Sequence, residues 1–152
     1  MVKNYNKEFN PELTPKQMLE YGVFGGSYLG NTIHKYPKSW FTRAKLSKTF
    51  DVKLNYFQIQ AGLSLKEWKE KGWIMEEDPR GWFQWYCRYS NGRRIEAIDK
   101  IQISSWKAFG PRHIGGIKKN CPKNSLSCRQ KQRQALLQCA YNPFIYFRVN
   151  IL

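Results

Sequence analysis

The chain has few acidic residues, and its last third has none. Only 11 Asp and Glu stand against 26 Lys and Arg among 152 residues, so the formal net charge is +15. No Asp or Glu follows Asp99, whereas ten Lys and Arg do. So large an excess of cations favours binding to a polyanion, and nucleic acid is the most common one. A basic surface without a specific partner is the alternative.

Long apolar runs are also missing. No stretch approaches the roughly 20 apolar residues that cross a bilayer, so we expect no membrane contact. The N-terminal residues 1–8 lack the apolar core of a secretory signal, and these two absences predict a soluble, intracellular protein. The terminal segment 143–152 is apolar apart from Arg148 and Asn150. It is compatible with a strand, with a packed end, or with contact to an assembly partner or a second copy of the chain.

Recognisable catalytic and metal-binding motifs are absent. The chain has no Walker loop, no G-x-S-x-G and no H-E-x-x-H. Its four cysteines contain no Cys-x-x-Cys pair, so neither a disulfide framework nor a zinc site is expected. Cys121 and Cys128 flank a short loop and could form a disulfide in the presence of an oxidant. We therefore expect no metal, no cofactor and no catalytic residues.

The composition and the helix signals predict a mainly α, compact single domain spanning residues 1–152. Hydrophobic residues make up 41% and aromatic residues 16% of the chain, enough for a packed core. Cap signals mark the starts of three helices, which glycines end, and two further helices are expected after them. Gly110-Pro111 and Gly115-Gly116 should break the chain between the last two helices. Residues 49–61 fit either a strand or a loop. The predicted helices cover residues 14–22, 64–72, 78–90, 94–109 and 127–140.

An aromatic helix stands at the centre of the sequence. Trp82, Trp85, Tyr86 and Tyr89 recur at helical spacing and share one face, which is typical of a buried core stripe. An exposed ring in the same helix, such as Phe83, would be able to stack on bases. Both arrangements are compatible with the sequence.

Four arginines accompany these rings. Guanidinium groups can bind phosphate through two hydrogen bonds at once. Two interpretations are therefore open: two or more of these arginines contact phosphate, or they are solvated or paired with acids. Gly92 should end the helix with a positive φ. Of the two arginines that follow it, one should cap carbonyls or pair with Glu96 or Asp99, and the other should be exposed for phosphate. The four are Arg80, Arg88, Arg93 and Arg94.

A second basic stretch lies in the acid-free third. On the last predicted helix, its cations lie in the first turns, where they oppose the helix dipole and where a docked phosphate would be favoured. A solvated basic face is the alternative. The candidate nucleic-acid-binding residues of this stretch are Arg112, His113, Lys118, Lys119, Arg129, Lys131 and Arg133.

Four sequence strings carry a resemblance to a known family. They are Asp78-Pro-Arg-Gly-Trp-Phe-Gln-Trp-Tyr-Cys-Arg-Tyr with Gly92-Arg-Arg, Gly22-Val-Phe-Gly-Gly, Gly72-Trp-Ile, and Lys131-Gln-Arg-Gln-Ala-Leu-Leu-Gln. From about Leu19 to Tyr141 the chain resembles a family of uncharacterised proteins from algae, fungi, marine microbes and large DNA viruses. The resemblance implies a shared fold and no particular activity. Cys139 stands where the family pattern has Trp, and the segment from Pro143 onward departs from it.

The leading hypothesis is a small basic protein that binds the phosphate backbone of DNA or RNA and has no catalytic centre. Two alternatives stay open. The first is a nucleic-acid- or nucleotide-processing enzyme, and the second is a structural component of a larger assembly that docks through its C-terminal segment. The enzyme would need a pocket formed by Trp82, Arg88, Arg93, Arg94 and His113.

Overall fold

The computed structural model describes residues 5–62 and 65–147, and in these ranges the chain is mainly helical. No strand is present among the described residues, where an isolated bridge pairs Met75 with Asp78. Short 3-10 helices occupy much of residues 24–54: η1 (Phe24–Gly26), η2 (Gly30–Lys35), η3 (Lys38–Trp40) and η4 (Val52–Leu54). The prediction of a mainly α chain with about five helices is confirmed. The α-helices are α1 (Pro15–Tyr21), α2 (Leu65–Glu70), α3 (Trp82–Ser90), α4 (Glu96–Asn120) and α5 (Gln130–Leu137).

The first helix begins and ends at the predicted signals. The Thr14 side chain accepts a hydrogen bond from the backbone N–H of Gln17, and the Gln17 side chain accepts one from the N–H of Thr14. This capping box satisfies two N–H groups that the first turn leaves unpaired. Gly22 ends the helix with a φ of 100°. The cap predicted for α2 at Ser64 lies outside the described residues.

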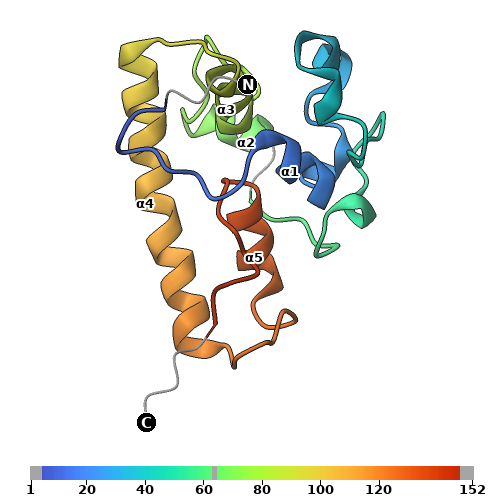
Figure 1. Cartoon of the computed structure of the whole chain (residues 1–152), viewed down its shortest axis with the longest axis vertical. Helices are drawn as coiled ribbons and strands as arrows, with labels where there is room; N and C mark the ends of the chain where they lie inside the picture. Colours follow the sequence, from blue (N-terminus) through green and yellow to red (C-terminus); the bar gives the residue numbers. More distant parts are fainter. Residues whose placement is uncertain (1–4, 63–64, 148–152) are drawn as a thin grey trace.

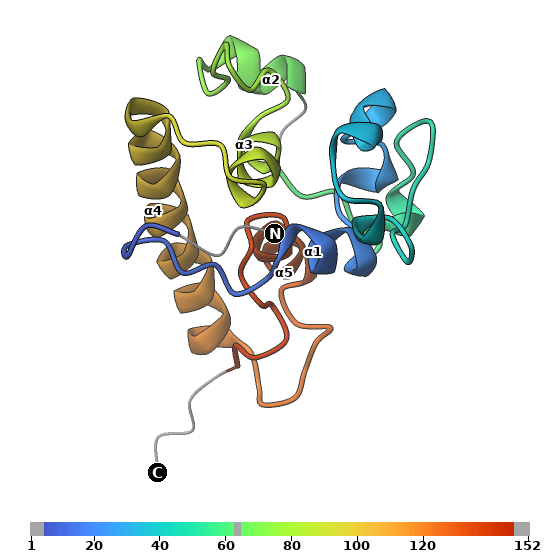
Figure 2. The ribbon, with the colours of Figure 1, turned by 45° about the horizontal axis from the view of Figure 1, so that its top comes forward.

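The long helix α4 lies along one side of the molecule, and α5 packs beside it (Figures 1 and 2). The N-terminal segment crosses α4, where the rings of Phe9 and Trp106 lie 5.1 Å apart. The 3-10 helices of residues 24–54 form a lobe on the opposite side, and α3 lies between this lobe and α4 (Figure 2). Because α3 is central, its side chains are buried on both flanks.

The aromatic stripe of α3 forms the core, as one of the two predicted arrangements requires. Trp85 and Tyr86 are completely buried, and the ring of Phe9 packs edge-on against Tyr86 and Tyr89. The alternative of an exposed Phe83 does not hold, since 1% of this residue is accessible and it packs against the lobe on the other flank of the helix. The rings of this helix are therefore structural.

The fourth helix continues to Asn120, so the predicted stop at Phe109 is wrong. Gly110 lies directly beneath the ring of Tyr141, which stacks on Trp106 at 4.9 Å. The Tyr141 hydroxyl also donates a hydrogen bond to the carbonyl of Trp106, 2.5 Å away. Pro111 costs about 3 kcal/mol in a helix interior. The packing of Tyr141 on this turn opposes that cost.

Replacing Gly110 by Ala is expected to lower the free energy of unfolding by about 2 kcal/mol, the usual effect of overpacking a core. The reason is that the added Cβ would lie 2.2 Å from a ring carbon of Tyr141. Gly115→Ala in the same helix is the matched control, because its Cβ meets nothing within 4 Å. The control should gain roughly 0.5–1 kcal/mol from helix propensity. Equal effects of the two substitutions in urea unfolding would contradict the close contact with Tyr141.

The described part of the apolar terminal segment packs onto the molecule itself. Tyr146 is 9% exposed and donates its hydroxyl proton to the carboxylate of Glu12. Pro143 is buried, whereas Ile145 is 58% exposed. Residues 143–147 therefore form a packed end, one of the three predicted arrangements, and residues 148–152 lie outside the described ranges.

Candidate nucleic-acid interface

The candidate residues form two groups at opposite ends of α4. The arginines of residues 80–94 lie at or before its start, and the cations of residues 112–133 lie along its second half and beyond (Figure 1). A helix of 25 residues is roughly 37 Å long. The two basic stretches therefore do not merge into one surface.

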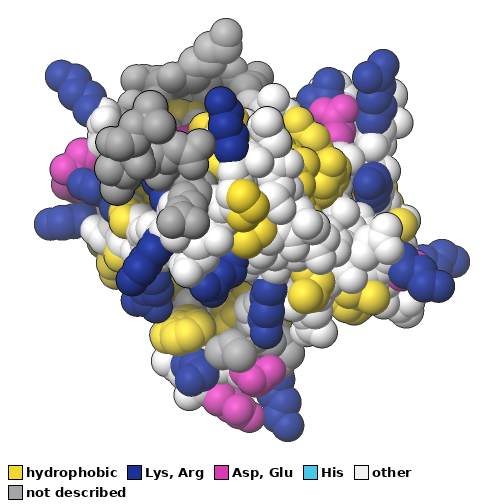
Figure 3. Space-filling model, turned by 90° about the horizontal axis from the view of Figure 1, so that it is seen from below, with side chains coloured by type: hydrophobic (Ala, Val, Ile, Leu, Met, Phe, Trp, Pro, Cys, Tyr) yellow, Lys and Arg dark blue, Asp and Glu magenta, His cyan; other side chains and the backbone are white. Residues whose placement is uncertain are grey.

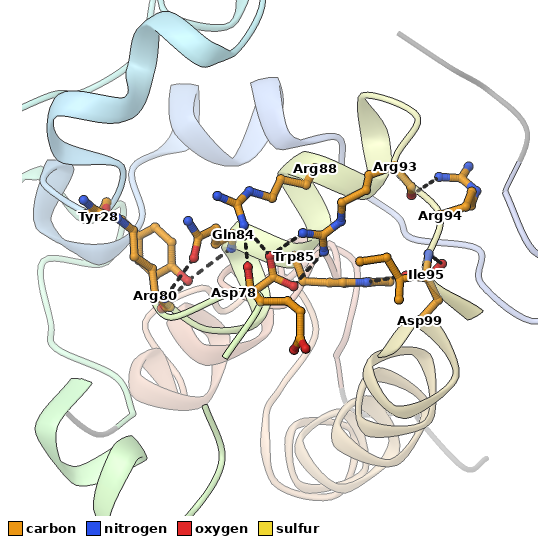
Figure 4. Close-up of polar contacts among 11 residues, drawn as sticks. Tyr28, Asp78, Arg80, Gln84, Trp85, Arg88, Arg93, Arg94, Ile95 and Asp99 are labelled. Atoms are coloured by element: carbon orange, nitrogen blue, oxygen red, sulfur yellow. Dashed lines mark hydrogen bonds and ion pairs between the residues drawn. The ribbon is translucent and has the colours of Figure 1, made fainter. Parts of the chain in front are cut away.

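A buried carboxylate organises two of the α3 arginines. Asp78 is fully buried and accepts hydrogen bonds from Arg93 Nη1 and Nη2 at 2.8 and 2.6 Å. Arg88 Nη1 donates to the same carboxylate at 3.0 Å and to the backbone carbonyl of Glu77 at 2.6 Å. Figure 4 shows the carboxylate between the two guanidinium groups. This network holds one negative and two positive charges.

The prediction that Asp78 and Pro79 open the aromatic helix is wrong. The helix α3 begins at Trp82, and its N-cap residue is Gly81 with a φ of 109°. A capping aspartate would accept from N–H groups of the first turn. Here the carboxylate is occupied by Arg88 and Arg93, which come 10 and 15 residues later in the chain.

Arg80 and Arg94 also serve the fold. Arg80 Nη1 donates to the carbonyl of Tyr28 at 2.8 Å, while the Tyr28 hydroxyl donates to the carbonyl of Arg80 (Figure 4). Arg94 Nη1 donates to the carbonyl of Tyr89 at 2.7 Å, and its guanidinium lies 3.6 Å from the centre of the Tyr89 ring. Arg94 is thus the residue predicted to cap helix carbonyls.

The companion prediction, a freely exposed Arg93, is wrong. Two of its nitrogens are paired with Asp78, and 25% of its side chain remains exposed. Arg93 pairs with Asp78, 15 residues earlier in the chain, and not with the nearer Glu96 or Asp99. Asp99 instead accepts from the Trp85 indole and from the backbone N–H of Ile95 (Figure 4).

The exposed parts of Arg88 and Arg93 line a pocket of about 400 Å³. Its other lining residues are Lys35, Tyr36 and Asn91. Burial raises the pKa of Tyr36, and the neighbouring Arg88 partly offsets this rise. Nothing in the sequence indicated this pocket, because η2 and the end of α3 are more than fifty residues apart along the chain.

The pocket expected for an enzyme is not formed by the predicted residues. Trp82, Arg94 and His113 do not line the pocket that contains Arg88 and Arg93. The Trp82 indole donates to the carbonyl of Gln102 on α4. No acidic side chain lines the pocket either. The alternative of a nucleotide-processing enzyme with this set of residues gains no support.

Five of the candidate cations in the acid-free third are exposed to solvent. We call them the C-terminal cations: Arg112, Lys118, Lys119, Arg129 and Lys131. The nearby carboxylate of Glu12 accepts hydrogen bonds from Tyr146 and from the backbone of Asn142. In the view from below (Figure 3), Lys and Arg side chains are spread over the surface with few Asp and Glu among them.

Arg133, predicted to bind nucleic acid, is a structural residue. Its side chain is completely buried. Nε donates to the carbonyl of Cys128 at 2.8 Å, Nη1 to that of Pro143 at 2.6 Å, and Nη2 to that of Ser125 at 3.1 Å. A guanidinium satisfied in this way cannot reach phosphate, so this prediction is wrong. Through these three bonds, Arg133 fixes the loop before α5 to the C-terminal segment.

His113 is half-buried and lies against Phe109, with the ring centres 4.4 Å apart. Its Nδ1 is buried and has no hydrogen-bond partner in the part of the chain that the structure describes. Burial lowers its pKa from the ordinary value, and the charge of Arg112 lowers it further. The imidazole is therefore neutral at pH 7 and adds no positive charge to the surface.

One cysteine pairing that the sequence left open is present in the structure. Cys121 and Cys128 form a disulfide that closes the loop between α4 and α5. Burial raises the pKa of the free thiols Cys87 and Cys139, the latter to about 12, so both are inert. The described residues contain no group of three or more His, Cys, Asp or Glu that could hold a metal ion. Within the same ranges, none of the helices combines the length and apolar character that a bilayer span requires.

Comparison of the chain with protein-family models, with curated proteins and with solved structures gave no match. The family resemblance carried by residues 19–141 therefore stays a prediction. What the chain does has to be argued from its own charges and contacts.

Proposed function

We propose that the protein binds nucleic acid through the phosphate backbone, with the C-terminal cations as its main contact. The observation that carries this proposal is their exposure in a stretch without acids. Arg112, Lys118, Lys119, Arg129 and Lys131 all face solvent, and residues 100–152 contain no Asp or Glu. Cations without an acidic neighbour in the sequence are available to phosphate, and they release its counterions when they bind it, which drives association.

The second half of α4 is suited to close approach by a phosphate backbone. Arg112 and Lys119 are seven residues apart, so they lie on the same face two turns from each other. Gly115 lies between them on that face, and the space where its Cβ would be is open. A phosphate chain can therefore approach the helix surface between the two cations. Such contacts read charge rather than base sequence.

The start of α5 adds donors to this surface. Its N-cap is Arg129, whose side chain does not cap the helix, so the first N–H groups lack a side-chain acceptor. The cations of the first turn oppose the helix dipole, and a bound phosphate would reverse that unfavourable term. Lys131 lies in this turn and is exposed.

Replacing both Lys118 and Lys119 by Gln is expected to weaken binding and to reduce the slope of log Kd against log salt by about two, one for each lost phosphate contact. The free energy of unfolding should fall by no more than about 1 kcal/mol, because both side chains are exposed, although they lie in the last turn of α4 and Lys118 lies over the ring of Tyr146. Fluorescence anisotropy with labelled DNA and RNA over a salt series measures the slope.

The matched control replaces Lys48 and Lys53, two exposed lysines of the lobe, by Gln. It removes the same charge from a distant surface. The control should change the slope by less than one. If the two double variants weaken binding equally, the protein carries only a generally basic surface and the C-terminal cations are not its contact.

A further inference from the structure

We infer that the pocket between η2 and the end of α3 binds a phosphate monoester, the terminal phosphate of a nucleotide or of a nucleic-acid strand. We call it the arginine pocket; it is lined by Lys35, Tyr36, Arg88, Asn91 and Arg93. The inference rests on the proposed function only in its choice of a nucleotide-type ligand. None of the C-terminal cations lines the pocket, and they lie on the second half of α4 and beyond it, so the pocket is a separate site.

Every residue that lines the pocket carries a hydrogen-bond donor. Three are cationic, and the other two offer an amide and a phenol hydroxyl. None is acidic. A site rich in cationic donors suits a ligand rich in acceptors, and phosphate oxygens accept from Arg and Lys through strong, charge-assisted bonds.

The charge of the site matches a dianion. Lys35, Arg88 and Arg93 carry three positive charges, and the buried Asp78 behind them carries one negative charge. The balance is two positive charges, counted from these four residues. A phosphate monoester carries about −1.5 to −2 at pH 7, whereas an internal phosphodiester carries one. The pocket therefore favours a terminal phosphate over the backbone.

The pocket is held in place before any ligand arrives. Asp78 fixes both guanidinium groups at distances of 2.6 to 3.0 Å. Tyr36 is 7% exposed and stacks on the buried Trp40 at 5.5 Å. Preorganised donors lose little entropy when they bind. The Nε of Arg93 is buried and has no acceptor among the described residues, so only the partly exposed end of its guanidinium can meet a ligand.

The C-terminal end of α3 carries a partial negative charge that would repel an anion. Its last carbonyls are occupied, however. The N–H of Asn91 donates to Cys87 and Arg88, the N–H of Gly92 donates to Tyr89, and Arg94 adds a cationic donor at Tyr89. The three cations of the pocket outweigh the remaining dipole.

The volume points to more than a bare phosphate ion. About 400 Å³ falls within the roughly 300–1,000 Å³ of small-molecule sites. A phosphate fills a small part of it, which leaves room for the attached sugar. A free nucleotide and the 5′ end of a strand present the same chemistry, so the experiment has to separate them.

The test uses the full chain and two pairs of probes. Adenosine 5′-monophosphate is compared with adenosine, and a 3′-labelled single-stranded DNA with a 5′-phosphate is compared with the same strand ending in a 5′-hydroxyl. We expect the phosphorylated member of at least one pair to bind about tenfold more tightly, as one good charge-assisted contact allows. A preference in the first pair alone identifies a free nucleotide as the ligand, and a preference in the second identifies a strand end.

Lys35→Gln tests the pocket without disturbing Asp78, because Lys35 is exposed at the end of η2. It should reduce the preference for phosphate at least about threefold, since one of three cations is lost. Lys38→Gln, an exposed lysine of the next turn, is the control and should leave the preference unchanged. Equal binding within both pairs overturns the arginine pocket. If the salt dependence of strand binding persists in that case, the proposed function stands without it.

Discussion

Replacing Asp78 by Asn is expected to lower the free energy of unfolding by about 3 kcal/mol, because removing one partner of a buried ion pair leaves the others uncompensated. Asp78 is fully buried, and both Arg88 and Arg93 donate to its carboxylate. The guanidinium groups are 28% and 25% exposed, so water recovers part of the loss. The melting temperature should fall by roughly 6–12 °C for a chain of this length, as measured by far-UV circular dichroism.

Glu77→Gln is the matched control, since it removes the same charge one position earlier. Glu77 is exposed, and its backbone carbonyl rather than its side chain accepts from Arg88. The control should melt within about 2 °C of the parent, the usual range for an exposed site. Equal melting temperatures for the two variants would show that the buried carboxylate does not hold the arginines.

Replacing Arg133 by Met is expected to lower the free energy of unfolding by about 3 kcal/mol and to leave nucleic-acid binding intact. Three carbonyls, those of Ser125, Cys128 and Pro143, lose a charged donor, and each such bond contributes roughly 1.5–3 kcal/mol. The desolvation cost of the buried guanidinium disappears with it and offsets part of this loss. Met fills much of the same volume, which limits the cavity. Urea unfolding followed by tryptophan fluorescence measures the loss.

Arg129→Met is the matched variant, because Arg129 lies four residues before Arg133 but is predicted to contact phosphate rather than to stabilise the fold. Arg129 is exposed at the N-cap of α5. Its loss should reduce the salt slope by about one and leave the melting temperature unchanged. If the Arg133 variant, assayed well below its melting temperature, loses binding while the Arg129 variant keeps it, the assignment of the two arginines is reversed.

Local signals in the sequence predicted much of the fold. Thr14 and Gln17 form a capping box, with Pro15 at the first helical position, because all the partners lie within four residues. The end of α4 could not be predicted in the same way. Gly110 and Pro111 read as a helix stop, and the ring that packs on this turn belongs to Tyr141, thirty-one residues later. The low helix propensity of Gly110 and Pro111 was overridden by the packing of Tyr141, a contact that no local sequence pattern reveals.

The same distinction holds for the charged residues. The exposure of the C-terminal cations follows from composition, since the last third of the chain contains no acid to pair them. The roles of Arg93 and Arg133 depend instead on Asp78 and on three backbone carbonyls that only the folded chain brings near. An arginine in a basic stretch is therefore not evidence of a phosphate contact until its burial is known.

The most direct test of nucleic-acid binding is the affinity of the unmodified chain for a 20-base-pair duplex across a salt series. Five phosphate contacts from the C-terminal cations predict a slope of log K against log salt of about −4.5. A single-stranded probe should give a shallower slope of roughly −3.5 with the same contacts. Affinity that does not change with salt, or no binding below about 10 µM at low ionic strength, would contradict binding through the phosphate backbone.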